Sequence, residues 1–250
     1  MSGGQTCPWF VPEWPVPANV GSCITQRFPG GSLPPYDGFN LATHVGDDSV
    51  QVEKNRGFLS GQLSIPGVFW LQQTHSNRVM PWGSDNQCDA SFSFEKQQAC
   101  AVLTADCLPL LVCDTGGTQV AAIHAGWRGM QAGIIEKTLR QFRSPPEHLL
   151  VYLGPCIGFD HFEIGEDVYR LLLTGMEQCS GNAVSCFRSS EKKGHYFADL
   201  PSMARLRLIS KGVTHIFGGE LCTFSERERF YSYRRDGEST GRIASLIWLL

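Results

Sequence analysis

Residues 99–129, ACAVLTADCLPLLVCDTGGTQVAAIHAGWRG, decide the fold of this chain. They contain two short apolar runs, Leu108–Cys113 and Val120–Ile123, with the turn sequence TGGT between them. This pattern is typical of two strands joined as a β-hairpin. Cys107 stands directly before the first predicted strand, and His124 stands directly after the second. We therefore expect both side chains to lie on one rim of a sheet.

A third side chain of the same kind is His75, which follows another predicted strand at Val68–Gln72 in the sequence QQTHSNRV. Two imidazoles and one thiolate suit a zinc ion whose fourth position stays open for chemistry. A metal in such a site lowers the pKa of a bound water and supplies hydroxide near neutral pH. The thiolate also makes copper acceptable. His75, Cys107 and His124 are thus the predicted metal ligands.

The same residues support a second hypothesis that needs no metal. Cys107 is then a nucleophile, and His124 or His75 is its general base. Asp106, the neighbour of Cys107 in the sequence, would orient that base. The residue pattern alone does not separate these two chemistries.

The composition narrows the class of protein. The chain has 250 residues, of which 42% are hydrophobic and 18% charged, with a net charge of -3. We therefore expect a buried globular core, no nucleic-acid partner and no membrane partner. The N-terminus has no pattern of a secretion signal, so we expect a cytoplasmic protein. The ten cysteines are scattered without a CxxC pair, which indicates buried reduced thiols. Cys156 differs in context, because it follows a predicted strand in a Gly-Pro turn that can face the site.

The remaining elements alternate irregularly between strands and helices, which favours the α+β class. Further strands are expected at Ala101–Leu103, Leu149–Leu153, Val213–Phe217 and Ile243–Trp248. Helices are expected at Gly129–Phe142, at Glu166–Glu177, from a cap at Asp199 to Ser210, and at Ser49–Ser60 with Val52, Phe58 and Leu59 facing inward. No linker divides the chain, so we expect one domain over residues 1–250, with residues 1–19 as an extended N-terminal arm.

Candidate substrate-binding residues occur in three polar or glycine-rich segments. Arg27, Asn40 and His44 lie in the first, where Arg27 suits an oxyanion and Asn40 a hydroxyl or carbonyl group. The segment AGWRG, which contains Arg128, leads from His124 into a predicted helix whose N-terminus favours anions. The segment FYSYRRDG at residues 230–237 contains Tyr233 and Arg234, which can stack on a ring and clamp a phosphate.

Taken together, the motifs resemble those of the YfiH-like family, also called the polyphenol-oxidase or laccase-domain family. The motifs in question are TQRFPGG, YDGFNLATHVGDD, QQTHSNRV, CDA at 88–90, TADCLPLL, AAIHAGWRG, LGPCIG, FEIGEDV and YSYRRDG-STGR. They run in order from about residue 20 to the C-terminus. One departure is TQRFPGGSLPPYDGFN, where many relatives have a GGVS-type loop.

The resemblance implies a single α+β domain with β-sheets packed face to face and helices on the outside. It also implies zinc held by His75, Cys107 and His124. Members of the family cleave adenosine, inosine, guanosine or methylthioadenosine with phosphate to a base and ribose 1-phosphate, and they also deaminate adenosine. This chemistry needs an anion pocket, for which Arg27 with Arg128 or Arg234 is expected. The walls that a purine needs are expected from Phe39, Trp127, Tyr231 and Tyr233, and His44 or Asp106 would move a proton.

Other functions remain open from the sequence. Some relatives are linked to removing a misplaced serine from peptidoglycan precursors, and the fold is similar to that of cysteine-dependent toxin deamidases, so an amidase or cysteine hydrolase is the main alternative. Older descriptions of the family give copper-dependent phenol oxidation, but a multicopper oxidase needs far more than the seven histidines present, and the chain has no HxH pair. A binding module without catalysis is a further possibility, against which the ligand-type residues at strand ends argue.

Overall fold

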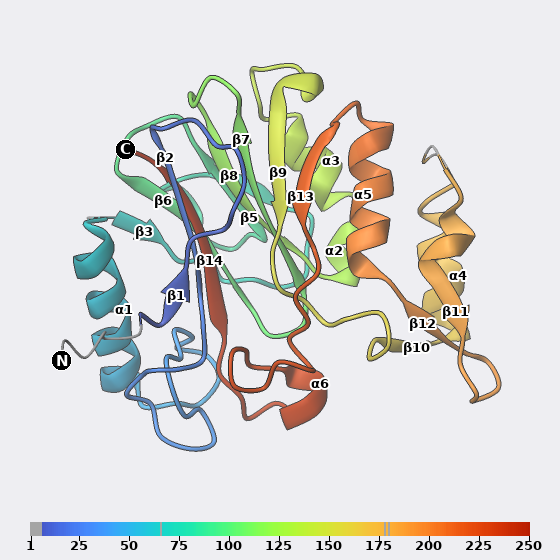
Figure 1. Cartoon of the computed structure of the whole chain (residues 1–250), viewed down its shortest axis with the longest axis horizontal. Coiled ribbons are helices and arrows are strands. Elements are labelled where there is room, and N and C mark those ends of the chain that lie inside the picture. The colour runs from blue at the N-terminus through green and yellow to red at the C-terminus, as the bar shows by residue number, and fades with distance from the viewer. Residues whose placement is uncertain (1–6, 66, 178, 180) are drawn as a thin grey trace.

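The computed structural model describes residues 7–250 except 66, 178 and 180 (Figure 1). The strands are β1 Trp9–Phe10, β2 Val20–Thr25, β3 Gly67–Phe69, β4 Val79–Pro81, β5 Ala90–Ser93, β6 Gln98–Thr104, β7 Leu108–Asp114, β8 Val120–Ala125, β9 Leu149–Leu153, β10 Glu163–Gly165, β11 Phe187–Ser189, β12 His195–Ala198, β13 His215–Gly218 and β14 Ile243–Leu249. The α-helices are α1 Ser49–Leu63, α2 Trp127–Gln131, α3 Ile134–Leu139, α4 Glu166–Thr174, α5 Leu200–Ser210 and α6 Tyr233–Asp236.

Two large sheets form the centre of the molecule. One has the strand order β1-β2-β14-β6-β3 and the other has the order β13-β9-β7-β8-β5-β4. The sheets pack face to face, because Ile24 and Val102 of the first share a buried cluster with Leu111 and Ala122 of the second. This arrangement confirms the expected packing of sheets.

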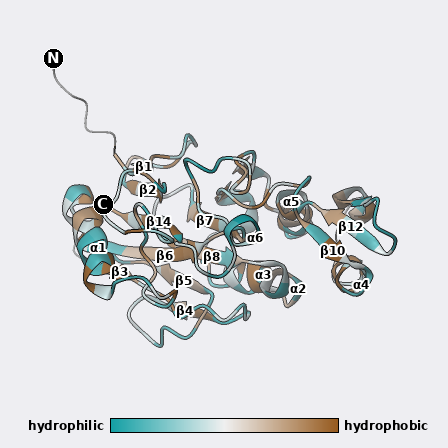
Figure 2. Ribbon diagram, turned by 90° about the horizontal axis from the view of Figure 1, so that it is seen from below, coloured by the Kyte–Doolittle hydropathy of each residue, from teal (hydrophilic) through white to brown (hydrophobic). Residues whose placement is uncertain are grey.

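Helices cover the outer faces of both sheets, which gives four layers (Figure 2). Leu59 of α1 packs with Leu246 on the outer face of the five-stranded sheet. Ile134 of α3 and Met203 of α5 pack with Leu110 on the outer face of the six-stranded sheet. A small sheet, β10-β12-β11, lies with α4 beyond α5. The α+β class with helices outside is confirmed.

The hairpin that dominates the sequence is the middle of the six-stranded sheet. β7 and β8 are antiparallel, with Leu111 opposite Ala122 and Pro109 opposite His124. Every residue of β7 is buried. Side chains alternate in direction along a strand, so Leu110 faces the helices while Leu111 faces the other sheet. Burial on both faces explains why the strand is apolar throughout.

Several predicted boundaries were wrong. The helix predicted over Gly129–Phe142 is two helices, α2 and α3, separated at Gly133 with a φ of 84°. A left-handed residue ends a helix, and glycine adopts that conformation without strain. The predicted inward position of Phe58 is also wrong, because its side chain is 43% exposed. The strand predicted to begin at Val213 begins at His215, and the helix predicted to reach Glu177 ends at Thr174.

The segment predicted as an N-terminal arm is attached to the domain over its described part. β1 pairs with β2 through Trp9 opposite Thr25. Trp14 lies in the buried cluster between the sheets, and its indole donates a hydrogen bond to Ser22 Oγ at 3.2 Å. Residues 1–6 of the predicted arm lie outside the described residues. The described residues that follow them are held against the domain by β1 and by the Trp14 side chain.

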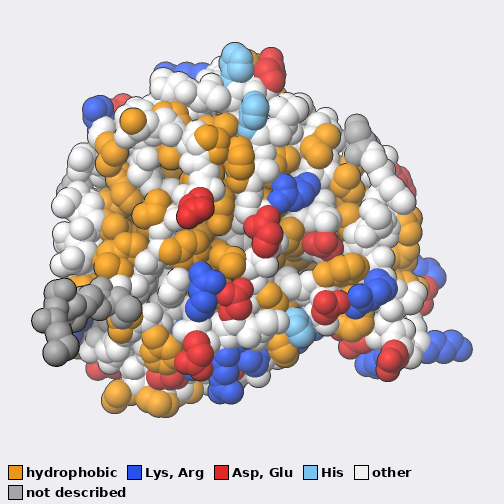
Figure 3. All heavy atoms as spheres, in the orientation of Figure 1, with side chains coloured by type: hydrophobic (Ala, Val, Ile, Leu, Met, Phe, Trp, Pro, Cys, Tyr) orange, Lys and Arg blue, Asp and Glu red, His pale blue; other side chains and the backbone are white. Residues whose placement is uncertain are grey.

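Two properties of the described chain bear on the predicted class of protein. Of its helices, none has both the length and the apolar character that crossing a membrane requires. Charged side chains of both signs are scattered over the face drawn in Figure 3. All ten cysteines are free thiols, and six of them are buried, as the sequence predicted: Cys23, Cys88, Cys100, Cys113, Cys156 and Cys186.

Candidate metal centre

The three predicted ligands meet at one end of the β7–β8 hairpin. Cys107 precedes β7 and His124 lies in β8, and the antiparallel pairing makes their backbones neighbours. His75 comes from the loop between β3 and β4. The Cys107 Sγ and His75 Nε2 atoms are 3.6 Å apart, and the centroids of the two imidazole rings are 4.8 Å apart. One donor atom of each residue lies within 4.8 Å of the other two.

The separation of the Cys107 and His75 donor atoms fits a zinc ion. Zinc binds sulfur at about 2.3 Å and imidazole nitrogen at about 2.0–2.1 Å, so two neighbouring donors of a tetrahedral site lie about 3.3–3.8 Å apart. The separation of 3.6 Å between Cys107 Sγ and His75 Nε2 is in this range. Gly126 leaves the necessary room, because a Cβ at its position would lie 2.9 Å from Cys107 Sγ and 3.1 Å from His75 Cδ2. The three side chains therefore suit a metal with an open position.

Electrostatics favour the ligand form of the cysteine. Burial raises the pKa of the Cys107 thiol, but the charge of His124 and hydrogen bonds from both imidazoles lower it further, to about 6. Burial lowers the pKa of His124, while the Cys107 thiolate and Asp89 raise it to about 9. A thiolate is the form that binds metal or attacks as a nucleophile. The geometry is thus compatible with both hypotheses.

The carboxylate that contacts the His124 imidazole is Asp89, and the prediction that Asp106 would orient a histidine of the site was wrong. Asp89 is fully buried, and its Oδ1 lies 2.8 Å from His124 Nδ1. The Asp106 carboxylate instead accepts hydrogen bonds from the Thr223 hydroxyl and the Arg234 backbone amide. Burial raises the pKa of Asp89, but hydrogen bonds from His124 and Ser76 lower it to about 2.

The ligands open onto a cavity of about 450 Å³, a size typical of small-molecule sites. Five predicted substrate-contact residues line it: His44, Trp127, Arg128, Tyr233 and Arg234. Residues that the sequence analysis did not assign to the site also line it: Gln73, Leu103, Thr104, Ala105, Ile157, Phe162 and Arg242. Arg242 belongs to the STGR motif, which was the one sequence signal that pointed to it.

Arg27 and Asn40 do not line this cavity. Arg27 forms an ion pair with Asp37 at 2.7 Å and lies against the Tyr231 ring. Asn40 is fully buried and accepts hydrogen bonds from the backbone amides of Ala42 and Arg242, each at 3.0 Å. Both residues therefore hold loops in place.

Two other expectations for the wall of the site were also wrong. Phe39 and Tyr231 are buried in the core, and the Tyr231 hydroxyl donates to the carbonyls of Tyr36 and Asp37. Cys156 is buried, and its neighbour Ile157 lines the cavity instead. The aromatic walls of the cavity are Trp127, Phe162 and Tyr233.

The arginines of the cavity differ from most others in the described part of the chain. Arg128, Arg234 and Arg242 make no ion pair there, whereas nine other arginines do. Arg128 stacks over Trp127 at 4.3 Å. Arg234 donates to the carbonyls of His161 and Glu163, and Arg242 donates to those of Thr240 and Gly241. The three guanidinium groups are thus held in place without being neutralised.

Comparison with known proteins gives consistent results. The family model described as multi-copper polyphenol oxidoreductase laccase matches residues 21–250. The chain is 45% identical to the purine nucleoside phosphorylase YfiH of Escherichia coli in an alignment 248 positions long, which covers 96% of this chain and 98% of the relative. It is 32% identical to a purine nucleoside phosphorylase of Mycobacterium tuberculosis, over 94% of each chain.

Solved structures have the same fold. A Neisseria meningitidis protein of the DUF152 family is 44% identical and has a TM-score of 0.91, over 97% of this chain and 99% of that one. YlmD of Geobacillus stearothermophilus is 28% identical and has a TM-score of 0.89, over 98% and 97% of the two chains.

Proposed function

The chain belongs to the multi-copper polyphenol oxidoreductase laccase family, and from this premise we propose that it is a zinc-dependent purine nucleoside phosphorylase. Relatives that match over 98% of their length bear the name purine nucleoside phosphorylase. One observation carries the proposal: the His75, Cys107 and His124 cluster opens onto a cavity with three arginines that form no ion pair in the described chain. The proposed partners are small molecules, a purine nucleoside and phosphate.

The arginines are the proposed phosphate site. Phosphorolysis forms a bond between a phosphate oxygen and C1′ of the ribose as the C1′–N9 bond breaks, and the purine leaves with the electron pair and takes up a proton. Guanidinium groups match phosphate oxygens in geometry and in charge. Arg128, Arg234 and Arg242 would hold the phosphate beside C1′, and this set replaces the pairing with Arg27 expected from the sequence.

The aromatic residues and His44 would bind the nucleoside. Trp127 and Tyr233 offer ring faces for a purine, since stacking tolerates any base. Burial and the charges of Arg242 and Arg56 lower the pKa of His44, which favours the neutral imidazole. A neutral imidazole on the cavity wall can exchange a proton with the base. We propose His44 for this role.

A metal held by His75, Cys107 and His124 would supply a Lewis acid and would activate a water molecule. This second property supports the further proposal that the enzyme deaminates adenosine to inosine, with the purine on the same aromatic walls. Zinc is preferred to copper because two imidazoles, one thiolate and an open position are typical of catalytic zinc.

Incubation of the zinc-loaded protein with adenosine tests the proposal. Adenine and ribose 1-phosphate should form only when phosphate is present, and inosine should form with or without it. Replacement of Arg242 by Gln should raise the KM for phosphate about ten- to a hundredfold, because it removes a charged hydrogen bond. The exposed Arg170→Gln variant on α4 is the control. The proposal fails if neither adenine nor inosine appears with zinc fully loaded.

The low pKa of Cys107 supports one alternative, a cysteine amidase or hydrolase. Cys107→Ser separates the two functions. A nucleophile role predicts loss of turnover with unchanged metal content, whereas a ligand role predicts loss of metal as well. The assay measures bound metal and turnover on the same preparation.

A further inference from the structure

We propose that Asp89 is a positioning residue that sets both imidazole ligands with one carboxylate. Five donors converge on its two oxygens, from His124 Nδ1 and from the segment Thr74–Ser76. Asp89 is fully buried in the fold, so water does not compete for these contacts. The inference rests on the proposed metal site and concerns how that site is held before metal binds.

The contact with His124 fixes the proton on its ring. Asp89 Oδ1 lies 2.8 Å from His124 Nδ1, and a carboxylate only accepts hydrogen bonds, so Nδ1 carries the hydrogen. The backbone adds a second link, because the His124 amide donates to the Asp89 carbonyl at 2.7 Å. Nε2 is then the nitrogen that a metal beside Cys107 would bind, displacing the second proton that a pKa of about 9 keeps on the metal-free ring.

The contacts with Thr74–Ser76 fix the backbone that presents His75. Asp89 Oδ1 accepts from the His75 amide at 3.0 Å, and Oδ2 accepts from the Ser76 amide at 2.7 Å and from Ser76 Oγ at 2.6 Å. His75 has a φ of 60°, in the left-handed region that residues other than glycine rarely adopt. Such a conformation persists where its surroundings hold it, and here one carboxylate does so.

The hydrogen bonds around Asp89 require that both of its side-chain oxygens act as acceptors. An asparagine at position 89 has one oxygen and one amide group. If the oxygen faces His124, the amide group meets the amide of Ser76, and two donors oppose each other. If the amide group faces His124, the ring must take its proton on Nε2, the atom needed for metal. Asp89→Asn therefore damages one ligand or the other.

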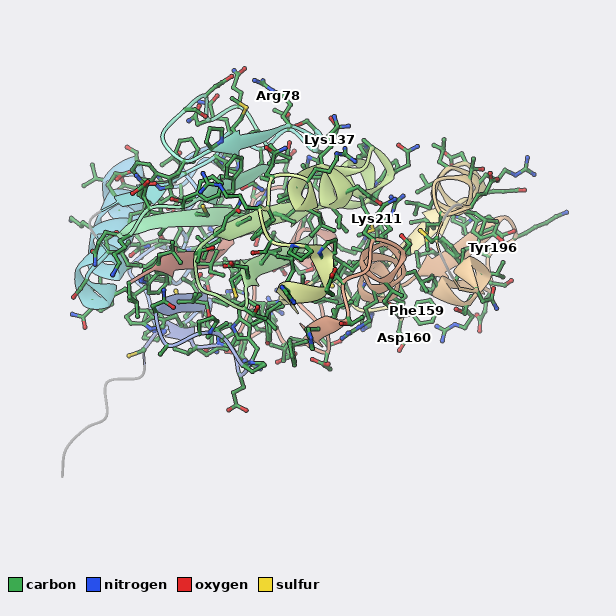
Figure 4. All side chains as sticks on the ribbon, turned by 90° about the horizontal axis from the view of Figure 1, so that it is seen from above. Arg78, Lys137, Phe159, Asp160, Tyr196 and Lys211 are labelled. Carbon is green, nitrogen blue, oxygen red and sulfur yellow. The ribbon has the colours of Figure 1, made fainter. Side chains whose placement is uncertain are left out.

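The test compares Asp89→Asn with Asp85→Asn in otherwise native protein. Asp85 is half exposed and pairs with Arg78, which Figure 4 shows at the outer edge of the molecule. In metal-free protein labelled with ¹⁵N-histidine and kept at a pH above the His124 pKa of about 9, where the ring is neutral, long-range proton–nitrogen spectra report the tautomer of His124. Competition with a chelator gives the Kd for zinc, and the visible spectrum of the Co²⁺-substituted protein reports the coordination geometry.

We expect His124 to carry its proton on Nδ1 in the native protein and in Asp85→Asn. In Asp89→Asn we expect a shift of the tautomer or a disordered His75 loop, a changed cobalt spectrum and a zinc Kd about 10- to 100-fold weaker. A folded Asp89→Asn protein with the native tautomer, cobalt spectrum and zinc Kd would overturn the inference.

Ser76→Ala decides the matter if Asp89→Asn does not fold. It removes one donor from Oδ2 and leaves the contact with His124 intact. The His124 proton should then remain on Nδ1 while the zinc Kd weakens severalfold, and an unchanged Kd refutes control of His75 by Asp89. If the native protein binds no zinc at all, the proposed function fails. The tautomers of the metal-free proteins would still test whether Asp89 orients the His124 ring.

Discussion

The Cys107 thiol should react with an alkylating agent at a pH where ordinary thiols are inert. Its pKa is about 6, since the neighbouring imidazoles favour the thiolate more than burial opposes it. The thiolate is the reactive form of cysteine. Removal of metal is the perturbation, because a bound zinc would occupy the sulfur. We therefore expect the metal-free protein to be alkylated at Cys107 in weakly acidic solution.

The size of the effect follows from the pKa. At pH 6 about half of Cys107 is thiolate, against about 0.3% of a free thiol with a pKa of about 8.5. The lower basicity makes each thiolate roughly 10- to 15-fold less nucleophilic. The net rate at pH 6 should be about tenfold above that of a free thiol, whereas at pH 8 it should be about threefold below.

The assay follows the reaction with iodoacetamide from pH 5 to pH 9 by mass spectrometry of the Cys107 peptide. A Cys7→Ser background removes one exposed thiol, and glutathione is the reference. Cys100 is an internal control, because burial raises the pKa of its thiol to about 12 and it should not react. Saturation with zinc should protect Cys107. A midpoint at pH 8 or above would refute the electrostatic account of the site.

Three further outcomes are expected. Zinc at a concentration one hundred times its Kd should stabilise the folded state by about 2.7 kcal/mol. A chelator should therefore lower the Tm measured by calorimetry, and an unchanged Tm would contradict zinc binding at the site. Gly126→Ala should weaken zinc binding at least about tenfold with an unchanged circular dichroism spectrum, because its Cβ would meet Cys107 Sγ at 2.9 Å, whereas Gly57→Ala, with open space around it, should bind zinc normally. Leu111→Ala should lower the free energy of unfolding in urea by about 2–5 kcal/mol, while Leu171→Ala, at a position 50% exposed, should cost less than about 0.5 kcal/mol.

The sequence was most informative where the signal is local. The hairpin of β7 and β8 follows from its apolar runs and from the turn between them. Cys107 and His124 flank those runs, so antiparallel pairing alone brings them to one edge. The helix over Gly129–Phe142 shows the limit of this reasoning, because its apolar spacing continues through the break that Gly133 makes.

The sequence was least informative where distant residues meet. Asp89 contacts a histidine 35 positions away, and no spacing rule predicts which carboxylate will do so. Arg242 reaches the cavity from the segment just before β14, more than a hundred residues from the ligands. The predicted roles of Arg27 and Asn40 in the site were wrong for a related reason. The sequence of a polar, glycine-rich loop does not reveal whether its side chains face a ligand or the loop itself.

The two-sided burial of β7 would make metal binding at the candidate site depend on correct folding. A slip of one residue against β8 would exchange the faces to which Leu110 and Leu111 point and would also separate Cys107 from His124. Misaligned molecules should thus lose both the packed interior and the ion. For material recovered from inclusion bodies, the zinc-to-protein ratio would accordingly report the fraction of chains that regained the native alignment.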